Sequence, residues 1–204
     1  MTSCPFGEII MKTAIGIGTA LVLSASGACA APDNSRAMND VVNHFFAAYR
    51  TVEVSDGIPD AKARPKYEPF ITPALDQLLI QGDQAEARYA KATNDDDPPL
   101  LEGDVFTSNF EGATSYAVRA CTAGGKTGTC TVDLVYDESK SDNRHAGPPA
   151  KPVKWTDTIY LLLTDKGWRI DDIGYGAGFD FGNKGKLRDE LKWAIAESKK
   201  PQSP

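Results

Sequence analysis

The stretch that decides the fold is residues 154–173, which read KWTDTIYLLLTDKGWRIDDI. The turn residues Asp165-Lys166-Gly167 divide it into a long apolar run and a return run that ends in two aspartates. Strand-like runs on either side of a short glycine-containing break are typical of a β-hairpin. The sequence therefore predicts two antiparallel strands, Val153–Thr164 and Gly167–Ile173.

Three more strands are expected before this hairpin. From Leu100 onward the spacing of apolar residues changes from helical to alternating, which predicts strands near Val105–Phe110, Thr114–Cys121 and Cys130–Asp137. A polar, proline-rich connection, Ser139–Lys151, separates the last of these from the hairpin.

Helices are predicted on both sides of the strands. Apolar residues recur at helical spacing from Asn34 to about Val52. Thr72-Pro73 opens a second helix that runs towards Thr93, because proline is favoured at the first helical position. A short helical piece is expected around Tyr67–Ile71, and a last helix from about Lys184 to Ser198. Helices followed by a meander of strands indicate an α+β fold.

The beginning of the chain has the pattern of a secretory signal peptide. Lys12 precedes an uncharged run, residues 13–30, with a short apolar centre and small residues at its end. Ala28-Cys29-Ala30 fits cleavage after Ala30, so residues 31–204 are expected to form a single periplasmic domain. Residues 1–10 read as an upstream extension, and lipid attachment at Cys29 stays open as an alternative.

The charge and hydropathy of the chain argue against nucleic acid as a partner and against a membrane span in the mature chain. The formal net charge is −6, and the Lys and Arg residues form no stripe that could neutralise phosphates, which argues against nucleic-acid binding. After signal cleavage no later segment reaches membrane-spanning length.

The cysteine pair Cys121 and Cys130 predicts a disulfide. The two residues lie nine positions apart, flanked by expected strands with a glycine-rich turn between them. In an oxidising compartment such an isolated pair indicates a bond across the hairpin rather than a metal site.

Two aspartates are candidates for chemistry. Alternation places Asp172 on the same strand face as Trp168 and Ile170, and Asp157 on the face of Ile159, so both carboxylates are expected to point into the fold. A carboxylate held among aromatic rings has a raised pKa and can act as general acid or base, with Tyr160 or Tyr49 as candidate partners in a pocket. The alternative is that Asp172 accepts hydrogen bonds and only fixes the end of the sheet. Asp104, after Gly103, is expected to cap a turn.

Three other patterns that could indicate a phosphate, calcium or metal site have simpler interpretations. Gly124-Gly125-Lys126-Thr127 lacks the first glycine of a phosphate-binding loop, because that position is Ala120. Asp95-Asp96-Asp97 precedes two prolines and reads as a solvated loop rather than a calcium site. His44 and His145 do not form a metal centre or an acid–base pair, and no cofactor or metal is expected.

Four segments together carry a family resemblance: Phe45-Phe46-x-x-Tyr49, residues 98–106 (PPLLEGDVF), residues 167–173 (GWRIDDI) and Leu187-Arg188-x-x-Leu191. In this order the chain resembles the bacterial envelope family called domain of unknown function 3828, over residues 36–195. That family is similar in architecture to the nuclear transport factor 2-like (cystatin-like) superfold. The resemblance implies N-terminal helices packed on a curved, cone-like, mainly antiparallel sheet with a C-terminal helix, and a mouth that holds a ligand or partner. It implies no catalytic residues.

Three functions follow as hypotheses. The leading one is a non-enzymatic periplasmic binding or envelope accessory protein that engages an envelope protein or a small apolar ligand in its cone. The second is a small lyase or isomerase that uses Asp172 or Asp157 with Tyr160 or Tyr49. The third is an immunity or inhibitor protein whose Ser139–Lys151 loop and acidic surface block a periplasmic toxin or hydrolase.

Overall fold

The computed structural model describes residues 33–52, 57–94, 96–140, 151–180 and 182–201. The predicted signal peptide, the alternative lipid attachment at Cys29 and most of the loop 139–151 lie outside the described residues. Within the described ranges no helix is long and apolar enough to cross a membrane.

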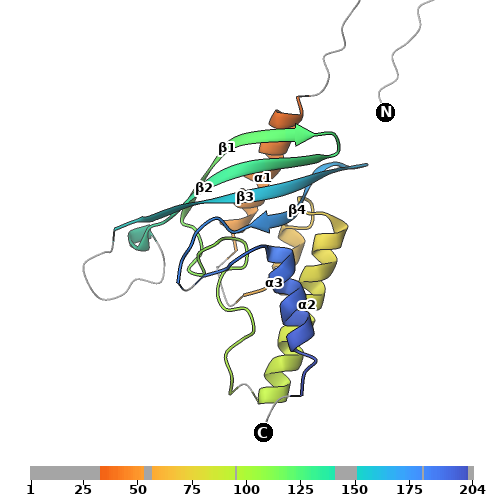
Figure 1. Cartoon of the computed structure of the whole chain (residues 1–204), viewed down its shortest axis with the longest axis vertical. Coiled ribbons are helices and arrows are strands. Elements are labelled where there is room, and N and C mark those ends of the chain that lie inside the picture. The colour runs from red at the N-terminus through yellow and green to blue at the C-terminus, as the bar shows by residue number, and fades with distance from the viewer. Residues whose placement is uncertain (1–32, 53–56, 95, 141–150, 181, 202–204) are drawn as a thin grey trace, which may run out of the picture. The chain divides into compact units, whose positions relative to one another are not determined.

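The described chain from Asp33 onward is an α+β unit, as predicted (Figure 1). Its α-helices are α1 (Asn34–Tyr49), α2 (Pro73–Thr93) and α3 (Leu187–Glu197), with short 3-10 helices η1 (Arg64–Lys66) and η2 (Glu138–Lys140). The strands β1 (Ser115–Gly124), β2 (Thr127–Tyr136), β3 (Val153–Thr164) and β4 (Gly167–Gly174) form one antiparallel sheet in the order β1-β2-β3-β4.

Helix α1 packs across β1, β2 and β4 on one face of this sheet. Its buried residues recur at helical spacing, so that one apolar stripe faces the strands. This stripe consists of Met38, Val42, Phe45, Phe46 and Tyr49. Helices α2 and α3 lie side by side below the sheet in Figure 1 and pack against each other.

The segment before α2 is extended and pairs with β4. The Ile170 N–H donates to the Phe70 carbonyl at 2.8 Å, and the Thr72 N–H donates to the Ile170 carbonyl at 2.8 Å, which gives a parallel bridge between Ile71 and Ile170. The helical piece predicted around 67–71 therefore lies earlier, as η1. The Thr72 side chain caps α2 by accepting from the Leu75 N–H at 3.1 Å.

The strand predicted near Val105–Phe110 does not form. Two carboxylates, that of the preceding Asp104 and that of Asp157 in β3, accept from its amides in place of a neighbouring strand. The Phe106 N–H donates to Asp104 Oδ1 and the Ser108 N–H donates to Asp157 Oδ2, each at 2.9 Å. Residues 105–110 are consequently a largely buried irregular segment. Such a segment can be buried only if its backbone polar groups have hydrogen-bond partners.

The predicted disulfide between Cys121 and Cys130 is present. The two residues are direct cross-strand partners in the pairing of β1 with β2, with Cα atoms 4.1 Å apart. Between Val118 and Cys121 the register of β1 shifts, so the disulfide follows an irregularity in this outer strand.

Candidate functional site

A bulge at Asp171 in β4 decides where the predicted site residues lie. Ile170 pairs with Leu161 and Asp172 pairs with Tyr160, so one extra residue of β4 stands between two consecutive pairs. Because consecutive positions of β3 point to opposite faces, Asp172 lies on the face opposite to Ile170. The prediction that Asp172 shares the face of Ile170 is therefore wrong.

Asp157 lies on the core face of β3, as predicted, and is completely buried. Its Oδ1 accepts from the Gly176 N–H at 2.8 Å and from the Ser108 hydroxyl, and its Oδ2 accepts from the Ser108 N–H at 2.9 Å and the Trp155 Nε1–H at 3.0 Å. Two donors on each oxygen use the acceptor capacity of the carboxylate. Asp157 thus joins three segments and offers no free position to a substrate.

Asp172 binds backbone amides at the start of α3. Its Oδ1 accepts from the N–H groups of Ile173 and Arg188, each at 3.0 Å. Burial, as the largest cause, raises the pKa of Asp172, and the two amides oppose this rise. Helix α3 has no side-chain cap at its own Lys186, so Asp172 supplies an acceptor to its first turn from the neighbouring strand.

Tyr160 is the cross-strand neighbour of Asp172, and the Lys186 Nζ lies 4.1 Å from the centre of its ring. These three residues contribute to a cavity of about 420 Å³ on the outer face of the sheet. The structure therefore brings Tyr160 and Asp172 together but separates both from Asp157. The Asp172 carboxylate binds amides rather than the tyrosine hydroxyl.

Tyr49 has a different carboxylate partner. Its hydroxyl donates to Asp104 Oδ2 at 2.9 Å and accepts from the Ala113 N–H at 2.9 Å. Burial and the Asp104 charge raise the pKa of Tyr49 well above the ordinary value of a tyrosine, so the hydroxyl stays protonated. The pair links the last turn of α1 with the irregular segment after Gly103.

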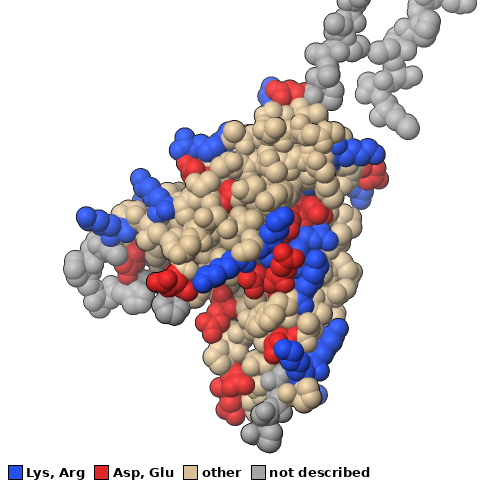
Figure 2. Space-filling model, viewed as in Figure 1, with Lys and Arg blue, Asp and Glu red and all other residues tan. Residues whose placement is uncertain are grey.

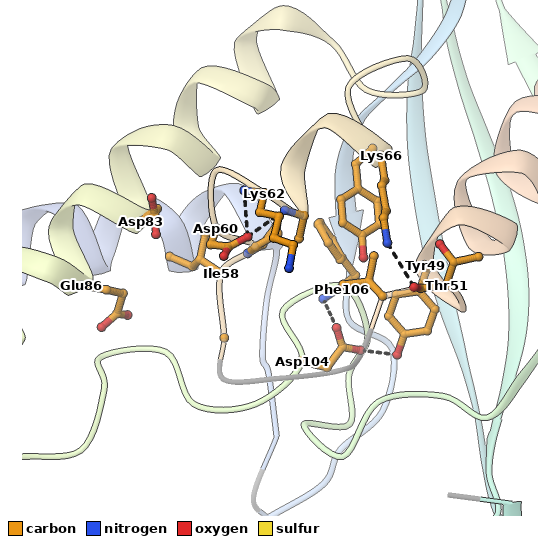
Figure 3. Close-up of a pocket in the computed structure, with 15 residues that line it drawn as sticks. Tyr49, Thr51, Ile58, Asp60, Lys62, Lys66, Asp83, Glu86, Asp104 and Phe106 are labelled. Atoms are coloured by element: carbon orange, nitrogen blue, oxygen red, sulfur yellow. Dashed lines mark hydrogen bonds between the residues drawn. The ribbon is translucent and has the colours of Figure 1, made fainter. Parts of the chain in front are cut away.

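This pair lies at a larger cavity, of about 630 Å³ (Figure 3). The end of α1, the segment 57–67, one side of α2 and residues 104–106 line this cavity, which is open to solvent on one side. Its lining mixes aromatic rings, aliphatic side chains and charges: Tyr49, Thr51, Val52, Gly57, Ile58, Pro59, Asp60, Lys62, Ala63, Lys66, Tyr67, Asp83, Glu86, Asp104 and Phe106.

Asp104 is the buried carboxylate of this cavity, with only 5% of its surface exposed. Burial is the main cause that raises the pKa of Asp104 to about 6, and the hydrogen bonds from the Phe106 amide and from the Thr107 and Tyr49 hydroxyls act in the opposite direction. All of these donors to its carboxylate are neutral groups. No Lys or Arg of the described residues forms an ion pair with Asp104.

Tyr67 forms an aromatic wall next to Asp104. Its ring centre lies 4.8 Å from that of Phe106 and 5.5 Å from that of Phe45. The side chain is 2% exposed. Its hydroxyl forms no hydrogen bond within the described residues, and since every fully buried polar side-chain atom there has a partner, this hydroxyl reaches the surface of the cavity. Burial and the nearby Asp104 charge raise the pKa of Tyr67, so this hydroxyl is also protonated.

The rim of the cavity carries charges of both signs. Glu86 accepts from the amides of Leu100 and Leu101, at 3.0 and 2.9 Å, and the Lys66 Nζ donates to the Thr51 carbonyl at 3.1 Å. Burial is the largest cause that raises the pKa of Asp83, and the charge of Asp60 adds to it. On the face seen in Figure 2, acidic and basic side chains likewise lie next to one another around the helices.

The prediction that Asp104 caps a turn is confirmed, since its Oδ1 accepts from the Phe106 amide two positions on. Its contact with Tyr49 and the place of Tyr67 in the cavity were not predicted. One signal was present: Asp104 stands directly before the apolar pair Val105-Phe106 and close after Leu100-Leu101, which is unusual for an exposed turn residue. Within the described ranges no group of three or more His, Cys, Asp or Glu residues is arranged to hold a metal ion.

Comparison of the chain with protein-family models finds no matching family, and comparison with curated proteins finds no match.

Proposed function

We propose that this chain is a secreted periplasmic binding protein that holds a small ligand in the cavity lined by Asp104, Tyr49 and Tyr67. The disulfide between Cys121 and Cys130 supports an oxidising compartment. The cavity, about 630 Å³, falls in the range of small-molecule sites.

One observation carries the proposal. A carboxylate without a cationic partner and a tyrosine hydroxyl without a hydrogen-bond partner border the same cavity, and both side chains are more than nine-tenths buried. Buried polar groups cost free energy unless a partner compensates them, and the protein gives Asp104 no opposite charge and the Tyr67 hydroxyl no hydrogen bond in the described residues. A ligand that occupies the cavity supplies both partners.

We also propose that the fold is a cone-like sheet of the nuclear transport factor 2-like type and that the chain is a member of the family known as domain of unknown function 3828. The antiparallel meander with α1 on one face supports this. This cavity differs from the apolar cone interior expected from the sequence, because its described lining comes from helices and loops and mixes aromatic, aliphatic and charged side chains.

The experiment uses residues 31–204, ¹⁵N-labelled, and a library of small fragments followed by backbone amide NMR shifts. We expect fragments that shift the amides of Tyr49, Tyr67 and Asp104. The variant Ala63→Trp should abolish this binding, because Ala63 lines the cavity and the indole fills it. Ala61→Trp is the matched control, since Ala61 is exposed in the same turn and does not line the cavity. Hits that bind Ala63→Trp as well as the unchanged chain would refute the site.

One observation supports the lyase or isomerase hypothesis, but the carboxylate concerned is Asp104 rather than Asp157 or Asp172. Asp104 and Tyr49 converge at 2.9 Å beside the cavity, and a carboxyl with a pKa of about 6 is suited to general acid–base catalysis. The same NMR samples separate the two functions, because an enzyme converts its bound ligand into new resonances over hours and a binding protein leaves it unchanged. The inhibitor hypothesis depends mainly on the loop 139–151, most of which lies outside the described residues.

A further inference from the structure

The charge balance around the cavity indicates which chemistry fills it. Asp104 receives hydrogen bonds from the Phe106 amide and the Tyr49 hydroxyl, which are both neutral, and in the described part of the chain no cation reaches its carboxylate. An opposite charge within hydrogen-bond distance favours the ionised form of a buried carboxylate. The cavity side of Asp104 is the position at which such a charge can enter.

The aromatic lining favours the same kind of ligand. The rings of Tyr49, Tyr67 and Phe106 border the cavity next to the carboxylate, and Figure 3 shows Tyr49, Phe106 and Asp104 close together at one end. Aromatic rings attract organic cations through their quadrupole, and a carboxylate beside them adds ion pairing. The Tyr67 hydroxyl, which borders the cavity, offers a hydrogen-bond acceptor as well as a donor.

The rim also disfavours an anion. Among the described residues of the lining, Asp60, Asp83 and Glu86 supply three further carboxylates, against the two ammonium groups of Lys62 and Lys66. Lys66 is occupied by the Thr51 carbonyl. An anionic ligand would therefore enter a site with an excess of negative charge and would meet Asp104 at its deep end.

From these contacts, and resting on the binding function proposed above, we infer that the ligand is an organic amine whose protonated head group lies between Asp104 and Tyr67. Its apolar part extends along Phe106 and Ile58, both of which line the cavity. This assigns a chemical class, an alkyl or aryl ammonium, to the site in place of the uncharged apolar ligand expected from the sequence.

The first test compares three probes of equal length on residues 31–204: hexylamine, 1-hexanol and sodium hexanoate, at about pH 7.5, where Asp104 is ionised. We expect hexylamine to shift the amides of Tyr49, Tyr67 and Asp104 and to bind on the order of tenfold more tightly than hexanol, because only the ammonium forms an ion pair. Hexanoate should not bind. Equal or tighter binding of hexanol or hexanoate, or no binding of hexylamine, would overturn the inference.

The second test removes one group at a time. Asp104→Asn should lower hexylamine affinity to about that of hexanol, while Asp165→Asn, the same change at an exposed hairpin position, should leave it unaltered. Tyr67→Phe should weaken binding several-fold, and Tyr160→Phe, which changes the other cavity, should not. Undiminished hexylamine binding by Asp104→Asn would contradict the inference. If Asp104→Asn does not fold, the probe comparison and Tyr67→Phe decide.

The two proposals fail in different ways. If neutral or anionic fragments bind in a manner that Ala63→Trp abolishes while hexylamine does not bind, the cavity is a binding site and the amine assignment is wrong. If neither the fragment library nor any of the three probes binds, the binding function itself is wrong.

Discussion

Asp157 and Ser108 are joined by two hydrogen bonds across 49 positions of the chain, one from the serine amide and one from its hydroxyl. This contact fixes the irregular segment 104–110 against the core face of β3. Since that segment also contributes Asp104 and Phe106, the contact holds one wall of the cavity in place.

Replacing Asp157 should destabilise the fold strongly. Asp157→Asn turns one acceptor oxygen into an NH₂ group that faces N–H donors, so we expect the free energy of unfolding to fall by about 2–4 kcal/mol. Denaturant unfolding followed by tryptophan fluorescence measures the change. Asp165→Asn on the exposed hairpin should change stability by less than about 0.5 kcal/mol. Equal stability of the two variants would show that the buried contacts of Asp157 contribute little.

Asp104 should make stability depend on pH in an unusual direction for a carboxyl. Its pKa is raised to about 6 in the folded chain from a model value of 3.8, so the native state binds the proton more tightly than the unfolded state. Its contribution to stability is therefore greatest below about pH 4 and is lost as pH rises through about 6, with a total of about 3 kcal/mol. Asp104→Asn should lack this contribution.

The measurement is the free energy of unfolding of the unchanged chain and of Asp104→Asn between about pH 4 and 7.5. The difference between the two should move in favour of the variant as pH rises. Other carboxyl groups with shifted pKa values, such as Asp83 and Asp172, occur in both proteins and cancel. A difference independent of pH would mean that the Asp104 pKa is not raised.

Asp172 should stabilise α3 through the Arg188 amide. Asp172→Ala removes this acceptor and should cost about 0.5–2 kcal/mol, whereas Asp172→Asn keeps a side-chain oxygen and should cost less than half as much. Thermal unfolding by circular dichroism compares the two variants. Equal losses would indicate that the carboxylate charge, rather than its acceptor oxygen, matters.

Replacing both Cys121 and Cys130 by serine should reduce stability by about 1–3 kcal/mol and leave the fold intact, because the loop that the bond closes is short. In residues 31–204 these are the two cysteines, so thiol titration of the unfolded, unreduced protein should find no reactive thiol. Two reactive thiols per chain would show that the bond does not form in solution.

The sequence predicted those helices and strands whose patterns depend only on neighbouring residues. Strand β3 has the predicted bounds, Val153–Thr164, and α2 begins at the predicted Pro73, because alternation and the Thr-Pro start are features of adjacent residues. The disulfide was also predicted, since its two cysteines lie on neighbouring strands of one hairpin.

The site could not be predicted in the same way, because its contacts join distant parts of the chain. Tyr49 meets Asp104 across 55 positions, and nothing near either residue indicates the other. The bulge at Asp171 could not be predicted either, because residues 169–173 (RIDDI) fit a regular alternating strand as well as they fit the observed pairing. One extra residue was enough to move Asp172 to the other face of the sheet.

The bridge between Ile71 and Ile170 has a consequence for how the protein behaves at high concentration. Exposed outer strands are templates on which a second chain can add, and aggregation begins there. The segment 70–72 occupies part of the free side of β4, and on the opposite outer strand the irregularity after Val118 interrupts regular pairing. Both margins of the sheet are thereby protected against self-association. Substituting Ile71 with proline would expose one of them and should make the protein prone to fibrous aggregates.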